Sequence, residues 1–102
     1  MLVMTRAAGE SVLIGDDLLT VVRVTPSVRI AVREGRTRRT HQFRGGNYKT
    51  NQSLSIGSCR VVLMAVARKE VTLGFDAPKS VVIVRSELLP LDETSNPDPD
   101  QR

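Results

Sequence analysis

Short apolar segments rich in valine, isoleucine and leucine recur along the chain, separated by turn-forming residues. The most uniform is 81–84, where four β-branched residues follow one another without a polar interruption. Ala77-Pro78 precedes it, and a proline fixes its own φ while pushing the preceding residue into extended geometry. A run this short and branched is typical of a strand covered on both faces. After it we expect Ser86 to cap a very short helix that Pro90 would end.

The cleanest alternation lies at residues 28–33, where apolar residues exchange with cationic or small ones. That is the period of a half-buried strand. Residues 18–24 alternate in part, and Thr25-Pro26-Ser27 separates the two segments as a turn, so together they predict a hairpin. Further strands are expected at residues 1–6 and 11–14.

The hairpin pattern then appears a second time. It returns 42 residues later in the first long strand and 43 residues later in the second. The second copy consists of residues 52–58, 60–66 and 71–76, which echo 10–16, 18–24 and 28–33. The pattern predicts a mostly β fold of small antiparallel sheets, arranged as a barrel-like sandwich of about six to seven short strands.

Charge divides the chain into two parts. Residues 1–89 hold 14 basic and 7 acidic residues, whereas residues 90–102 hold one basic and four acidic residues. We therefore expect one basic domain over 1–89 and an acidic disordered tail over 90–102. The basic domain favours a polyanionic partner. A single cysteine fits a reducing cytoplasm, and no apolar run approaches the length needed to span a membrane.

An arginine-rich insertion at residues 33–51 separates the two copies. Its part from Arg33 to Lys49 contains six basic residues and one acidic residue. It is either the edge of a strand or a loop. One interpretation is an arm that binds phosphate groups without reading sequence. The other is a solvated segment whose charge keeps an exposed sheet edge from aggregating.

Candidate catalytic and metal-binding residues are few. The one histidine, His41, lies in the charged insertion, where we expect it to be solvated. Cys59 has no second cysteine or neighbouring histidine, which favours a structural role over a nucleophile or metal ligand. Asp16 and Asp17 are adjacent in a turn, where carboxylates commonly accept backbone hydrogen bonds. The sequence therefore predicts no enzyme, no cofactor and no small-molecule substrate.

Aromatic residues limit the kind of RNA-binding domain that this chain could form. Only Phe43, Tyr48 and Phe75 are present, and no two of them share a predicted strand. Modules that stack bases on a sheet need such pairs. An RNA-binding domain here must instead read bases with strand-edge backbone groups, aliphatic side chains and arginine.

Two motifs lie at opposite ends of the chain. The first is Met-Leu-Val-x-Thr-Arg followed by Gly-Glu-Ser, at residues 1–11. The second is Ala-Pro-Lys followed by Ile-x-Arg-x-Glu-Leu, at residues 77–88. Together, in this order in one short chain, they resemble the carbon storage regulator (CsrA/RsmA) family of RNA-binding translation regulators.

The resemblance implies an intertwined homodimer whose first and last strands join the middle strands of the partner subunit. It also implies binding of GGA triplets in hairpin loops of mRNA leaders, with control of translation initiation, and a possible small regulatory RNA partner. Carried over to this chain, the RNA site comprises Leu2, Thr5 and Arg6 on one wall, and Ala77, Pro78, Val81, Ile83 and Arg85 on the other. Arg85 would make the largest contribution.

The chain departs from the family pattern in ways that leave a second function open. A family member has the hairpin once, and here the second copy is the expected core because it runs directly into the Ala77-Pro78 stretch. Ala7 and Ala8 stand where a basic residue is usual, and Val84 replaces a histidine. These departures favour the alternative of a protein-interaction module that pairs with an ordinary regulator of this type.

Overall fold

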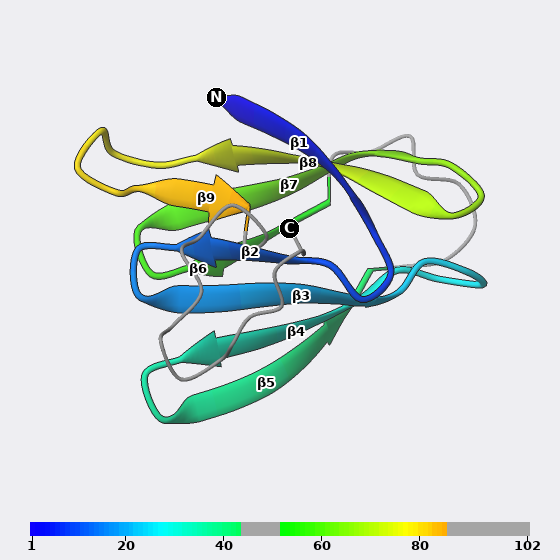
Figure 1. Ribbon diagram of the computed structural model, residues 1–102, viewed down its shortest axis with the longest axis horizontal. Helices are drawn as coiled ribbons and strands as arrows, with labels where there is room; N and C mark the ends of the chain where they lie inside the picture. Colours follow the sequence, from blue (N-terminus) through cyan, green and yellow to red (C-terminus); the bar gives the residue numbers. More distant parts are fainter. Residues whose placement is uncertain (44–51, 86–102) are drawn as a thin grey trace, which may run out of the picture.

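The computed structural model describes residues 1–43 and 52–85, which form nine antiparallel strands in two sheets (Figure 1). The strands are β1 (Leu2–Ala7), β2 (Ser11–Ile14), β3 (Asp17–Arg23), β4 (Arg29–Glu34), β5 (Thr37–Gln42), β6 (Ser53–Ile56), β7 (Cys59–Val66), β8 (Glu70–Asp76) and β9 (Ile83–Arg85). The mostly β fold is confirmed, but six to seven strands was too low a number. The predicted C-terminal helix and acidic tail lie outside the described residues.

The predicted repeat corresponds to two equivalent three-stranded units. β2, β3 and β4 lie side by side in one sheet, and β6, β7 and β8 lie in the other. Each unit has an irregular register at the same place, between Val21 and Arg23 in β3 and between Leu63 and Ala65 in β7. Gly15 and Gly57 occupy equivalent turns with φ of 60° and 59°, a conformation that glycine adopts without steric cost.

The core lies between the inner faces of the two sheets. Sheet A has the order β1-β8-β7-β6, and sheet B has the order β5-β4-β3-β2-β9. Strand alternation sends every second side chain inward, so the same pattern that predicted the strands also fills the core. The most deeply buried large side chains are Phe43, Phe75, Leu19, Ile30, Ile56, Leu63 and Leu73. No helix in the described part of the chain is long and apolar enough to cross a membrane.

The first and last strands each join the unit to which they are not adjacent in sequence. β1 pairs with β8 of the second unit, and β9 pairs with β2 of the first. The strand exchange that the resemblance implied between two subunits therefore occurs inside one chain. β5 completes this arrangement, because it pairs with β4 as β1 pairs with β8.

The prediction that residues 81–84 form a strand covered on both faces was wrong. β9 begins at Ile83, and Val82 is 65% exposed. The physical reason is the place of β9 at the edge of sheet B, where β2 is its hydrogen-bonded neighbour in the described structure. Just before β9, the carbonyl oxygen of Val82 accepts a hydrogen bond from Gly15 N at 2.8 Å.

Candidate nucleic-acid interface

One hollow brings together five of the eight predicted site residues from opposite ends of the chain. Leu2 lies on β1, opposite Phe75 of β8, and Ile83 lies on β9. Between β8 and β9 the chain passes along the same hollow, which has a volume of about 230 Å³. Its lining residues are Met1, Leu2, Phe75, Asp76, Ala77, Pro78, Lys79, Val81 and Ile83. The two motifs thus meet in space within one chain.

Three apolar residues of the hollow that were predicted as site residues lie at the margin of the core. Leu2 is 43% exposed, and Val81 and Ile83 are partly buried, packed against the edge of the core. An exposed fraction this large shows that Leu2 is not a plain core residue. Their side chains can contact the face of a nucleobase while the strands beside them offer backbone donors and acceptors.

Arg85 lies beyond the lining of this hollow but on the same inner face of β9 as Ile83. It pairs with Val12, and Ile83 pairs with Ile14, so register places both side chains on the face turned toward sheet A. Arg85 is exposed because β9 is an edge strand. No carboxylate among the described residues lies within ion-pair distance of it. Its guanidinium is therefore placed to meet a ligand at the edge of the sandwich.

Arg6 is built into the protein instead of projecting from it. Its side chain is 4% exposed, and its Nε donates to Thr5 O at 2.9 Å. Its Nη1 donates to Ser11 O at 3.3 Å, and Nε lies 3.6 Å from Glu10 Oε1. Glu10 in turn accepts a hydrogen bond from Ala7 N at 2.7 Å. Arg6 thus stabilises the turn between β1 and β2. Thr5, the residue before it on β1, is exposed.

Comparison with known proteins adds a family assignment for the part of the chain that forms one wall of the hollow. Residues 47–91 match the family model CsrA, described as the global regulator protein family. The chain contains a CsrA-family region. Its bounds agree with the prediction that the second copy, continuous with Ala77-Pro78, is the family core. Searches of curated proteins and of solved structures gave no match. CsrA-family proteins are regulators and generally bind RNA.

In the described structure, β6 of the CsrA-family region has no strand neighbour equivalent to the one that β9 provides for β2. In the first unit, Gly15 N donates to Val82 O. At the equivalent position of the second unit, Gly57 N donates to Glu34 Oε2 at 3.0 Å. Arg39 Nη2 donates to Ser55 O at 2.6 Å, and its Nε donates to Glu34 Oε1 at 3.1 Å. The side chains of Glu34 and Arg39 thus bind backbone groups of β6. Along β2, the equivalent side of the strand is paired with β9.

At this second edge β5 has the position that β1 has at the first, but its residues differ from those of β1. Register makes Arg39 the counterpart of Leu2, because their partners Val32 and Phe75 are equivalent. By the same rule Gln42 is the counterpart of Thr5. Within the described residues, a first strand and a last strand therefore meet at one edge only at β1 and β9. Sequence reasoning missed the Glu34–Arg39 contacts, since no local pattern predicts which side chains reach the opposite sheet.

His41 is half-buried, contrary to the prediction of a solvated side chain. Its ring packs edge-on against Phe43, with centroids 4.7 Å apart. Burial, and then the nearby Arg39 guanidinium, lower the pKa of His41 below its ordinary value of 6.5. The lowered pKa favours the neutral imidazole over the charged form.

Cys59 should react slowly with a thiol reagent such as DTNB in the folded protein and rapidly in concentrated guanidinium chloride. Its side chain is 1% exposed, and burial followed by the Asp76 charge raises its pKa above 9.0. Because the raised pKa favours the protonated thiol in the folded state, this contribution to stability is complete below about pH 9.0 and is lost as pH rises further. Equally fast labelling in both states would contradict the structure.

Proposed function

We propose that this protein is a sequence-specific RNA-binding regulator that binds GGA triplets in hairpin loops of mRNA leaders and controls translation initiation in the cytoplasm. The supporting observation is the meeting of Leu2 with Ala77, Pro78, Val81 and Ile83 in one hollow. Small regulatory RNAs that present the same loop would occupy the same site.

The chemistry of this edge suits recognition of unpaired bases. β1 ends sheet A and β9 ends sheet B, so each strand has a row of backbone groups that no described strand pairs. Such groups can hydrogen-bond to base edges, and the exposed aliphatic side chains can pack against base faces. The Arg85 fork can bind a guanine edge or a phosphate in a bidentate manner.

We further propose that one chain binds one RNA loop. The outer strands are exchanged within the chain, and the second edge is occupied by the Glu34–Arg39 ion pair. A homodimer, implied by the family resemblance, stays a prediction. If two chains associate, each would contribute a complete site of its own instead of half of a shared one.

Titration of a GGA-loop RNA hairpin, beside a hairpin with the triplet scrambled, tests this function at near-physiological salt. We expect tight binding to the GGA loop that saturates at one RNA per chain, and much weaker binding to the control. Equal, weak and salt-sensitive binding to both hairpins would contradict sequence-specific readout. Saturation at one RNA per two chains would contradict the single-chain site.

The alternative, a module that pairs with an ordinary CsrA-type regulator, has one observation in its favour. Met1, Val3 and Met64 are 69%, 52% and 45% exposed. The two methionine side chains lie over Gly74, where a Cβ would meet both sulfur atoms. Apolar side chains therefore gather on the outer face of sheet A, which would suit a protein partner. Failure of both hairpins to bind would make this alternative the better proposal.

A further inference from the structure

The outer face of sheet B contains a straight row of residues that leads away from the proposed RNA site. Register aligns Val84, Leu13, Leu18, Arg33 and Arg38 across β9, β2, β3, β4 and β5. Residues opposite one another in a sheet point to the same face, and neighbouring strands lie about 4.8 Å apart. The row therefore runs roughly 19 Å from the residue beside Arg85 to a pair of arginines.

Arg33 and Arg38 face each other across two neighbouring strands. Arg33 and Arg38 are directly opposite in the β4–β5 ladder, and both are exposed. Like charges in this arrangement repel and destabilise the pair. No carboxylate of the described residues lies within ion-pair distance of either one, whereas the neighbouring Arg39 is paired with Glu34. A bound anion would relieve the repulsion.

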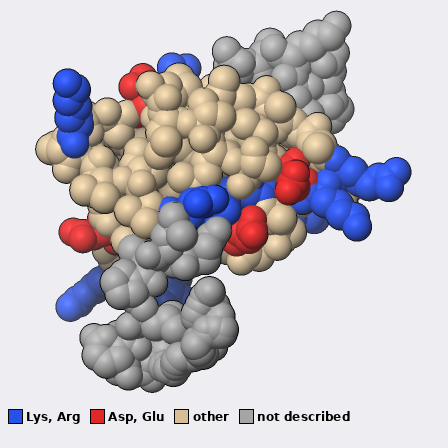
Figure 2. Space-filling model, turned by 45° about the horizontal axis from the view of Figure 1, so that its top comes forward, with Lys and Arg blue, Asp and Glu red and all other residues tan. Residues whose placement is uncertain are grey.

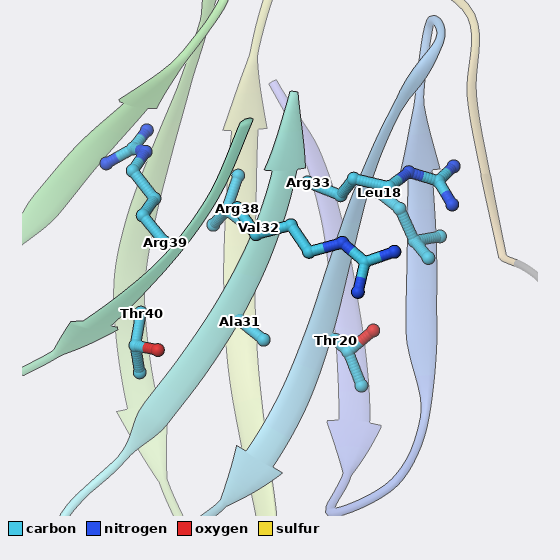
Figure 3. Close-up of a pocket in the computed structure, with 8 residues that line it drawn as sticks. All are labelled: Leu18, Thr20, Ala31, Val32, Arg33, Arg38, Arg39 and Thr40. Atoms are coloured by element: carbon cyan, nitrogen blue, oxygen red, sulfur yellow. The ribbon is translucent and has the colours of Figure 1, made fainter. Parts of the chain in front are cut away.

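The arginine pair borders an open hollow on the outer face of sheet B. Its volume is about 390 Å³, and Leu18, Thr20, Ala31 and Thr40 line it together with Arg33 and Arg38. Figure 3 shows that both arginines extend across the sheet toward Leu18 and Thr20, while Arg39 points the other way. Figure 2 shows basic side chains on several parts of the visible face, with acidic ones among them.

We propose that Arg33 and Arg38 bind phosphate groups of the RNA strand that flanks the loop held at β1 and β9. This inference rests on the proposed function, which it extends with a second contact region. Guanidinium groups bind phosphate through paired N–H donors, and the threonine hydroxyls can donate to the same oxygens. Among the described residues that line the hollow there is no aromatic side chain, so we expect the contact to fix the position of the backbone without reading sequence.

A polymeric anion fits this face better than a small one. The hollow is open and its arginines are exposed, so a free phosphate would remain largely hydrated and bind weakly. An RNA already bound at the β1/β9 edge brings its own phosphates close at a high effective concentration. Each phosphate neutralised also releases counterions, which makes the contact measurable through its salt dependence.

The test compares the Arg33→Gln/Arg38→Gln variant with the unmodified protein. The ligands are a GGA-loop hairpin with single-stranded flanks and its scrambled-loop counterpart, each titrated over a range of salt concentrations. We expect the slope of log affinity against log salt to become shallower by about 0.7 for each phosphate that the variant no longer neutralises. Both RNAs should bind more weakly by the same factor, so that the preference for GGA is unchanged. Circular dichroism confirms that the variant is folded.

A matched control removes two charges elsewhere. Arg36→Gln/Arg68→Gln changes one arginine in the β4–β5 turn and one in the β7–β8 turn, both exposed. It should leave the salt slope close to that of the unmodified protein. An equally shallow slope in the control, or an unchanged slope in the Arg33/Arg38 variant, would overturn the phosphate site. Absence of any preference between the two loops in the unmodified protein would instead overturn the proposed function.

Discussion

Replacing Arg85 by alanine should lower affinity for a GGA-loop hairpin by roughly 30-fold or more, because truncating one partner of a charge-assisted pair at an interface costs about 2–5 kcal/mol. The fold should be unaffected. Arg85 is exposed on the edge strand β9, and surface substitutions of this kind usually change the free energy of unfolding by about 0.5 kcal/mol or less. Fluorescence anisotropy measures the affinity, and urea unfolding measures the stability.

Two further variants make this experiment specific. Arg85→Lys keeps the charge but removes the planar fork, so we expect it to bind RNA poorly if the contact is bidentate. Arg36→Ala removes the same charge from an exposed turn and should bind nearly as well as the unmodified protein. If Arg85→Ala unfolds the protein, Arg85 is a structural residue and its assignment to the site is wrong.

Replacing Arg6 by alanine should instead destabilise the fold, by about 2–4 kcal/mol. Its buried guanidinium donates to the carbonyls of Thr5 and Ser11, and truncation would leave these acceptors without that donor. It would also remove the ion pair between Arg6 and Glu10. The shift in the urea midpoint at unchanged m-value measures this destabilisation.

Thr5→Ala is the matched control for Arg6. Thr5 precedes Arg6 on β1, but its hydroxyl is exposed and bonds to Thr72 Oγ1 at 3.2 Å. We expect a stability change of about 1 kcal/mol, since a typical hydrogen bond contributes about 0.5–1.5 kcal/mol net. If Arg6→Ala keeps its stability and fails to bind RNA, Arg6 is a contact residue and its buried hydrogen bonds are secondary.

Sequence patterns predicted the two hairpin units because the required information is local. Alternation marks the inward residues, and glycine marks turns with positive φ, as at Gly15 and Gly57. For β5 the sequence did not distinguish a strand from a loop, because Thr37–Gln42 is polar throughout and shows no apolar alternation. Its strand conformation comes from pairing with β4 and from Phe43, which follows it into the core. Tertiary context decides such a segment.

The sequence indicated that residues from the two ends of the chain would lie together, but not how they come together. The motifs at the two ends of the chain named Leu2 and Ile83 as parts of one site, and both line the same hollow. Whether the two strands meet within one chain depends on how β1 and β9 pair over long sequence separations, which a motif does not contain. The burial of Arg6 was missed for a related reason, since it depends on the side chain turning back toward Ser11 O.

The interlocked strand order also sets when the fold can form during synthesis on the ribosome. β1 is made first, yet its partners from Glu70 to Phe75 are made long after it, and β2 waits longer still for β9. Pairings so distant in sequence slow folding, because loop closure must precede the contacts that reward it. Neither sheet can be completed from the first half of the chain. Until residue 85 has emerged, β2 presents an open edge, and the nascent chain is most exposed to aggregation in that interval.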